Sequence, residues 1–252
     1  MAVKSNKPNR ELLLGFHSVL EALKADRRKF DTIFIAQSRS AKRASKIVDM
    51  AAKRRITVKT LDPKKMDEMA DGPIHQGIIA QVSPFPLMSM DKSIRDLETR
   101  KQPFLVLVLE NIEDPHNLGA LIRTALCTGV DYIMVPKDRA ALPSPTVSRA
   151  SAGAMEHAKV CTITNTRNLL VELKQKGAWV AGLDAGGDQM LSQVDLAGNM
   201  VLVVGGEHKG IRPLVKKECD FVVSIPIKGP VNSLNASVAG GMALYEALRQ
   251  RS

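Results

Sequence analysis

The chain has 252 residues, 44% of them hydrophobic and 25% charged, which excludes an intrinsically disordered protein. Its longest apolar runs, such as 104–109 and 201–204, are far shorter than the roughly 20 residues of a membrane-spanning helix, so we expect no membrane span. The net charge of +10 is concentrated in residues 1–83, which contain 17 Lys and Arg against 9 Asp and Glu, whereas residues 84–252 contain 19 against 17.

Residues 1–83 are predicted to form a small α/β domain. Apolar periodicity favours helices over 18–25 and 41–54 and strands over 32–36, 56–60 and 78–82. The excess of positive charge indicates a polyanionic partner, most simply a nucleic acid, although a solvated basic surface without a partner has the same composition. Pro84 and Pro86 then interrupt helix and sheet, and we place a linker over 84–103.

Residues 104–252 alternate strands with helices and are predicted to form a mostly parallel α/β sheet. The strand runs are continuously apolar, which is typical of strands covered on both faces. The predicted strands span 104–110, 132–136, 178–183, 200–205 and 221–227, and helices are expected over 118–128, over 169–176 and from 236 onward. Because ligands bind beyond the carboxyl ends of strands in open α/β sheets, the loops there are candidates for a functional site.

The loop after the first of these strands, ENIEDPHNLGALIRTALCTG, is predicted to begin a helix with Asp114 as its N-cap and Pro115 as its first residue. Asn117 lies in the first turn, where free N–H groups can bind an anion. Arg123 has apolar neighbours, which favours either an arginine that reaches solvent along its aliphatic stem or a contact with a phosphate or carboxylate.

Two further loops contain unusual residues. After strand 200–205, the sequence GGEHKGI places Glu207 behind Gly205 and Gly206, which permit close backbone approach but are equally typical of a simple tight turn. The loop after 221–227 contains Ser233 and Asn235 before the last helix, and it has more polar side chains than one helix cap requires.

Other catalytic and binding patterns are missing from the sequence. There is no Walker A or GxGxxG glycine pattern, no nucleophile elbow and no HExxH pair. The histidines are scattered, and Cys127, Cys161 and Cys219 are far apart, so we expect no metal site and no disulfide and place the protein in a reducing cytoplasm. The basic N-terminus has no apolar segment behind it, so we expect no secretory signal.

In this order, the segments DPHNLGALIRTA, GGEHKG and IPIKGPVNSLNASVA resemble the three sequence motifs of the SpoU (TrmH-like) RNA ribose 2′-O-methyltransferases. GFHSVLEAL (15–23) and HQGIIA (75–80) resemble the family's small RNA-binding domain, whose fold is similar to a ribosomal protein. The similarity is greatest to the bacterial enzymes that methylate a guanosine ribose in 23S ribosomal RNA. The implied organisation is a substrate RNA-binding domain over 1–83, the linker, and a methyltransferase domain over 104–252 with a C-terminal trefoil knot.

The resemblance implies S-adenosylmethionine as the cofactor, bent within the knot and held largely by backbone groups, with no metal. The implied cofactor contacts are Gly205, Ile225 and Leu234, with Gly206 and Ile227 nearby. Members of the family are homodimers that pack through the knotted region, so we expect a homodimer with the last helix in its interface.

The resemblance also implies five catalytic residues, Asn117, Arg123, Glu207, Ser233 and Asn235. In the family, the arginine is proposed to be primed by a substrate phosphate and to help deprotonate the ribose 2′-OH. Because a guanidinium holds its proton very tightly, we expect Arg123 instead to bind the phosphate and stabilise developing alkoxide charge. Asn117, Ser233 and Asn235 are expected to orient the site, and Glu207 to position its loop.

His208 and Lys209 stand where the family often has glycine after the glutamate, which affects the expected loop conformation and RNA contacts. Two other functions remain open: ribose methylation of transfer RNA, and a non-catalytic RNA-binding role in ribosome assembly with the fold retained. The substantial basic domain favours ribosomal RNA over transfer RNA. The intact set of polar site residues favours an enzyme, and the missing glycine pattern disfavours a Rossmann-type nucleotide enzyme.

Overall fold

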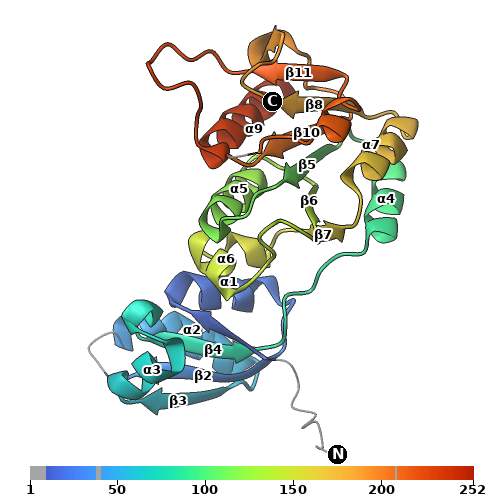
Figure 1. The fold of residues 1–252 in the computed structure, drawn as a ribbon. Coiled ribbons are helices and arrows are strands. Elements are labelled where there is room, and N and C mark those ends of the chain that lie inside the picture. Colours follow the sequence, from blue (N-terminus) through green and yellow to red (C-terminus); the bar gives the residue numbers. More distant parts are fainter. Residues whose placement is uncertain (1–9, 38–40, 208) are drawn as a thin grey trace, which may run out of the picture. The chain divides into compact units, whose positions relative to one another are not determined.

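The computed structural model describes residues 10–37, 41–207 and 209–252. The chain divides into two compact units, Met1–Pro86 with Ser144–His157 and Leu87–Pro143 with Ala158–Ser252. Figure 1 labels the elements of both. Of the residues singled out in the sequence, His208 and the basic N-terminal residues 1–9 lie outside the described part of the chain.

The first unit is a four-stranded mixed sheet in the order β1–β4–β2–β3, with helices packed on both of its faces. Alternate strand residues point to opposite faces, so Ile33 packs with α1 and α2 whereas Ile79 packs with α3. This arrangement confirms the predicted small α/β domain. The elements of residues 10–86 are β1 (Glu11–Leu14), α1 (Phe16–Ala25), β2 (Phe30–Ala36), α2 (Ala41–Lys53), β3 (Thr57–Leu61), α3 (Pro63–Ala70), the 3₁₀ turn η1 (Pro73–His75) and β4 (Ile78–Val82).

The segment Ser144–His157, with α6 (Pro145–Ala150) and η2 (Ala154–Glu156), belongs to the first unit, although the sequence places it between two strands of the second. Buried Arg28 donates to the buried Glu156 carboxylate from Nε at 2.7 Å and to Glu11 from Nη1 at 2.5 Å. Ser148 Oγ donates to Glu156 at 2.7 Å. The expected boundaries therefore differ from the structure, because this long-range ion pair has no local sequence signal.

The second unit contains a seven-stranded parallel sheet in the order β7–β6–β5–β10–β8–β11–β9, which confirms the predicted α/β class. Strand β5, next to the central strand β10, is buried along its whole length, as its continuous apolar run predicts. The strands are β5 (Leu105–Glu110), β6 (Tyr132–Pro136), β7 (Val160–Ile163), β8 (Trp179–Leu183), β9 (Gln189–Met190), β10 (Met200–Gly205) and β11 (Phe221–Ser224).

Helices cover both faces of this sheet, α5 and α9 on one and α4 and α7 on the other (Figure 1). The sheet and helices form the three-layer arrangement expected of an α/β unit. The remaining elements are α4 (Met90–Glu98), α5 (Pro115–Cys127), α7 (Thr166–Gln175), η3 (Leu191–Gln193), α8 (Pro213–Lys216) and α9 (Ala236–Arg251).

Segment 84–103, expected to be a linker, is largely part of the second unit. Met88 N donates to Val160 O at 2.9 Å, and α4 packs on β7. The strand expected over 221–227 ends at Ser224, because Pro226 has no N–H to continue the ladder. The trefoil knot stays a prediction. Within the described residues, no helix is both long and apolar enough to cross a membrane.

Candidate active site

The carboxyl ends of the three neighbouring strands β5, β10 and β8 define the site. Gly205 of β10 pairs in register with Glu110 of β5, and Val204 pairs with Leu183 of β8. The loops that follow these strands therefore begin side by side at one edge of the sheet. The segment before α9 joins them there, since Ser233 and Leu234 line the same cavity as Gly205.

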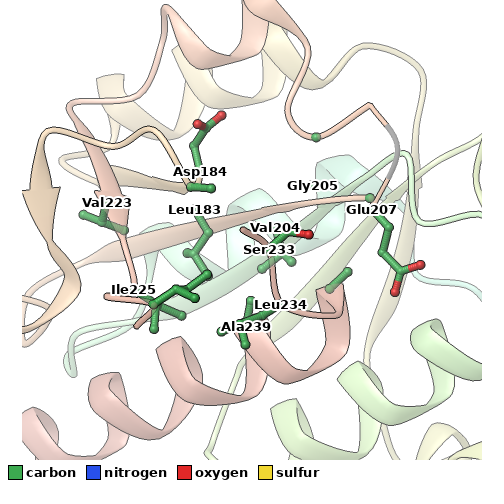
Figure 2. Close-up of a pocket in the computed structure, with 15 residues that line it drawn as sticks. Leu183, Asp184, Val204, Gly205, Glu207, Val223, Ile225, Ser233, Leu234 and Ala239 are labelled. Atoms are coloured by element: carbon green, nitrogen blue, oxygen red, sulfur yellow. The ribbon is translucent and has the colours of Figure 1, made fainter. Parts of the chain in front are cut away.

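This cavity has a volume of about 250 Å³ and a mostly apolar lining. Figure 2 shows Ile225 and Leu234 on the side toward α9 and Asp184 on the opposite side. All five residues that the sequence resemblance assigns to the cofactor line it: Gly205, Gly206, Ile225, Ile227 and Leu234. Aliphatic walls with a few polar groups are typical of a small-molecule site.

Close backbone packing explains the glycines of the cavity. A Cβ atom on Gly205 would lie 2.4 Å from the carbonyl carbon of Gly210, and one on Gly206 would lie 2.0 Å from the carbonyl oxygen of Asn111. Gly206 N also donates to Glu110 O at 2.8 Å, which fixes the strand end against β5. No larger residue fits either position without moving the backbone.

Asn117, Glu207 and Asn235, one from each of the three motif loops, form a hydrogen-bonded cluster beside the cavity. Asn117 Nδ2 donates to Glu207 Oε1 at 3.2 Å, and Asn235 Nδ2 donates to Asn117 Oδ1 at 3.0 Å and to Glu207 Oε1. The two amides thus hold one carboxylate oxygen from both sides. Residues up to 118 positions apart in the chain meet at this point.

Helix ends place two members of the cluster. Asp114 caps α5 by accepting from His116 N, with Pro115 at the first helical position, which confirms the predicted start and puts Asn117 in the first turn. Asn235 caps α9, because its Oδ1 accepts from Ser237 N at 2.9 Å and from Val238 N at 3.3 Å. Asn235 therefore uses its oxygen for the helix and its Nδ2 for the cluster.

A second cavity, of about 230 Å³, adjoins the first and is also lined by Glu207. It shares Gly206, Glu207 and Ala236 with the first cavity and is also lined by Asn117 and Lys209. Two adjoining cavities that share a fixed carboxylate in their walls can hold two reactants next to each other.

The other two predicted catalytic residues lie outside the hydrogen-bonded cluster. Ser233 lines the first cavity but makes no hydrogen bond to Asn117, Glu207 or Asn235 in the described structure. Arg123 is exposed on α5. No hydrogen bond or ion pair joins it to another described residue, so its guanidinium is available to a ligand.

The sequence reasoning missed the loop after β8. Leu183, Asp184 and Ala185 line the first cavity, and the available signal was another strand end followed by two glycines. Burial alone would raise the pKa of the Asp184 carboxyl, but the bond from Gly186 N at 2.9 Å and the ion pair with Lys216 at 3.0 Å hold it below its ordinary value. Asp184 is therefore a fixed negative charge at this wall.

Two family models match the chain. The model described as the SpoU rRNA methylase family matches residues 104–245, and the model for RNA 2′-O ribose methyltransferase substrate binding matches residues 12–88. The chain belongs to the SpoU rRNA methylase family. The resemblance drawn from the three sequence motifs is thereby confirmed.

Individual SpoU relatives match almost the whole chain. YacO of Bacillus subtilis, whose name assigns it to the TrmH family of tRNA/rRNA methyltransferases, is 39% identical over 244 residues, 96% of each chain. The 23S rRNA (guanosine-2′-O-)-methyltransferase RlmB of Pseudomonas aeruginosa is 39% identical over 242 residues, 96% of this chain and 97% of its own. The crystal structure of the SpoU methyltransferase AviRb from Streptomyces viridochromogenes with AdoMet has the same fold, with a TM-score of 0.77, 24% identity and coverage of 96% of this chain and 90% of that chain.

Proposed function

We propose that this SpoU protein transfers a methyl group from S-adenosylmethionine to the ribose 2′-OH of a guanosine in 23S ribosomal RNA. The observation that carries the proposal is the hydrogen-bonded cluster of Asn117, Glu207 and Asn235, whose member Glu207 lines both of two adjoining cavities. The names of full-length relatives support the substrate class. The direct test is transfer of label from tritiated S-adenosylmethionine to unmodified ribosomal RNA and, in parallel, to transfer RNA. Label on ribosomal RNA is expected, whereas label on transfer RNA alone would overturn the proposed target.

The first cavity suits the cofactor. Its aliphatic walls match the adenine ring, and Gly205, which has no side chain, lets the polar parts of the cofactor approach the backbone at the cavity wall. When bound, the cofactor supplies an electrophilic methyl group on a positively charged sulfur. The residues of the chain would hold the ribose oxygen next to the bound cofactor, and such positioning accounts for much of a methyl-transfer rate.

In this proposal the catalytic residues act at the second cavity. Asn117 and Asn235 fix the Glu207 carboxylate, which lines both cavities, and Ser233 provides a hydroxyl on the wall of the first cavity. Arg123 binds a phosphate of the RNA and stabilises negative charge that develops on the 2′-oxygen. Glu207 already accepts hydrogen bonds from two amides, whereas Arg123 pairs with its phosphate only when RNA is bound.

Replacing Gly206 with alanine is expected to weaken cofactor binding. The new Cβ would lie 2.0 Å from Asn111 O, so the strand end at the cavity must move. Overpacking of this kind costs roughly 1–3 kcal/mol, which corresponds to about five- to 150-fold in the Kd for S-adenosylmethionine. Titration calorimetry measures this Kd. Gly198→Ala is the control, because a Cβ atom at Gly198 would have no atom within 4 Å. Equal affinities in the two variants would contradict this role of Gly206.

We further propose that the first unit supplies much of the RNA affinity through its exposed lysines. Lys46 and Lys53 lie on α2, Lys59 on the edge strand β3, and Lys64 and Lys65 on α3, all of them exposed. Deleting residues 1–83 would not test this cleanly, because Glu156 would lose its buried partner Arg28. Substitutions in the full chain avoid that problem.

The variant with Lys59→Gln and Lys64→Gln is expected to bind RNA more weakly and with a shallower salt dependence. Each lost phosphate contact lowers the slope of log K against log salt by roughly 0.7 to 0.9. Filter binding over a salt series measures this slope. The control, Lys92→Gln with Lys101→Gln, removes two exposed lysines of the second unit. Identical slopes for both pairs would contradict a role of the first unit in RNA binding.

We also propose a homodimer that packs through α9. Val238, Met242 and Tyr245 are exposed at helical spacing, with Tyr245 64% exposed. They lie on the side of α9 opposite the buried Ala243 and Ala247. An apolar strip of this kind on a water-exposed helix is typical of a protein interface.

Replacing Tyr245 with glutamate is expected to weaken the dimer by at least about tenfold, because a charge would enter an apolar interface. Sedimentation velocity over a concentration series measures the dissociation constant. Val48→Glu is the matched control, since it places the same charge on an exposed apolar position of α2 in the first unit. An unchanged dissociation constant in the Tyr245→Glu variant would exclude this face of α9 as the dimer interface.

We place the protein in the cytoplasm and the trefoil knot at the site, as the sequence resemblance implies. Three unpaired cysteines suit a reducing compartment. Burial raises the pKa of the Cys219 thiol to about 11, so that it stays protonated and unreactive at neutral pH. Among the described residues, no group of three or more His, Cys, Asp or Glu side chains could hold a metal ion.

A further inference from the structure

Glu110 and Arg212 form an ion pair at the base of the segment that carries Glu207. Glu110 is the last residue of β5 and is completely buried, whereas Arg212, directly before α8, is half-exposed. The guanidinium donates to the carboxylate from Nε at 2.7 Å and from Nη2 at 2.9 Å. Thr166 Oγ1, buried at the start of α7, donates to the same carboxylate. Both oxygens of Glu110 are therefore satisfied by residues from distant parts of the second unit.

The backbone at Glu110 holds the other end of the same segment. Gly206 N donates to Glu110 O at 2.8 Å, and Gly210 N donates to Gly206 O at 2.8 Å, which closes a turn around Glu207. The next residue, Asn111, adopts a left-handed conformation with φ of 53° and donates from Nδ2 to Gly210 O at 3.1 Å. The end of β5 and the residue after it thus contact three residues of the segment from Gly206 to Arg212. Glu110 accepts hydrogen bonds from Gly206 and Arg212, and Asn111 donates one to Gly210.

This arrangement makes the position of Glu207 depend on an ion pair that does not touch either cavity. A bidentate bond between arginine and carboxylate fixes direction as well as distance. If the segment opened at Arg212, the fully buried Glu110 carboxylate would be left without its cationic partner, which is strongly unfavourable. The hydrogen bonds that Arg212 donates to Glu110 also raise the pKa of Arg212, so its guanidinium stays charged.

We propose that Glu110 and Arg212 are positioning residues for methyl transfer, which hold the segment from Gly206 to Arg212 so that Glu207 meets Asn117 and Asn235. This inference rests on the function proposed above. Neither residue contacts the reacting groups. Their effect is to keep the glycine backbone at the cofactor cavity and the Glu207 carboxylate in one fixed arrangement before the reactants bind.

Arg212→Gln, Arg212→Lys and Glu110→Gln in the full chain test the proposal. At saturating RNA and cofactor, kcat of Arg212→Gln is expected to fall by roughly 100-fold, since small displacements near reacting groups have effects of this size. The KM for RNA is expected to change less, because in the function proposed above the first unit supplies much of the RNA affinity. Arg212→Lys, which keeps the charge without the bidentate geometry, is expected to recover part of the rate. The double variant Glu110→Gln with Arg212→Gln is expected to lose no more of kcat than Arg212→Gln alone, because the two residues act through one ion pair.

Hydrogen exchange gives a second readout that needs no methyl transfer. The amides of Gly206 and Gly210 are expected to exchange faster in Arg212→Gln, with exchange in β5 and β10 unchanged. The control is Arg167→Gln, which breaks a more exposed ion pair with Glu218, of 2.7 Å, whose two residues lie outside the segment from Gly206 to Arg212. A kcat of Arg212→Gln within about twofold of the wild type, or an equal loss in Arg167→Gln, would overturn the proposal. Unchanged exchange at Gly206 and Gly210 would also overturn it. A wild-type chain without methyl transfer would contradict the proposed function instead.

Discussion

Replacing Asn235 with aspartate is expected to lower the methyl-transfer rate by about a hundred- to a thousandfold while leaving the protein folded. Aspartate keeps the oxygen that caps α9, and a negative charge at a helix N-terminus is favourable. The Nδ2 donor, however, becomes an oxygen that faces Glu207 Oε1 and Asn117 Oδ1. Repulsion between these oxygens opens the cluster without removing the cap. Single-turnover transfer of labelled methyl to RNA measures the effect.

Two alanine variants separate the cap from the cluster. Asn235→Ala loses both the helix cap and the cluster hydrogen bonds, and loss of the cap alone lowers the free energy of unfolding by about 1 kcal/mol. Asn165→Ala removes an equivalent cap from α7, where Asn165 Oδ1 accepts from Asn168 N at 3.1 Å, without touching the site. The expected result is a similar loss of stability in both and a loss of activity in Asn235→Ala alone. Full activity of Asn235→Asp would show that the cluster has no part in catalysis.

Replacing Arg123 with alanine is expected to reduce the transfer rate by roughly a hundred- to a thousandfold, the usual range for removing one group that stabilises developing negative charge. Arg123→Lys should retain part of the rate, because its ammonium still attracts a phosphate but lacks the planar fork of a guanidinium. Rates and RNA affinities of both variants measure the two contributions. Since Arg123 makes no hydrogen bond or ion pair in the described chain, neither change should lower thermal stability.

The Arg123 variants also distinguish between two roles. A literal proton acceptor would leave Arg123→Lys with an altered dependence of the rate on pH, whereas a phosphate-binding group changes the rate by the same factor at every pH. Undiminished activity in both variants would remove Arg123 from the mechanism.

Local signals made several parts of the fold predictable. The starts of α5 at Asp114 and α9 at Asn235 follow from caps that lie within a few residues of the helix. The central strands β5 and β10 follow from apolar runs that only a sheet covered on both faces buries. The two-residue strand β9 has no such run, because it sits exposed at the edge of the sheet.

Contacts between distant residues could not be predicted from local patterns. Arg28 and Glu156 are 128 positions apart, and their buried ion pair assigns Ser144–His157 to the first unit. Glu110 and Arg212 are 102 positions apart, and neither looks unusual beside its neighbours in sequence. The residues predicted to bind the cofactor came instead from the resemblance to the SpoU family, and the structure gathers them around the first cavity at one edge of the sheet.

Mapping of the methylated nucleotide tests the central claim most directly. Unmodified 23S ribosomal RNA would be incubated with labelled S-adenosylmethionine and the wild-type chain or Asn235→Asp, then hydrolysed with alkali, which leaves a bond next to a 2′-O-methyl ribose intact. We predict label in an alkali-resistant dinucleotide that begins with guanosine, present with the wild type and nearly lost with the variant. Label on a base, or equal labelling by the two proteins, would contradict the proposed reaction and site.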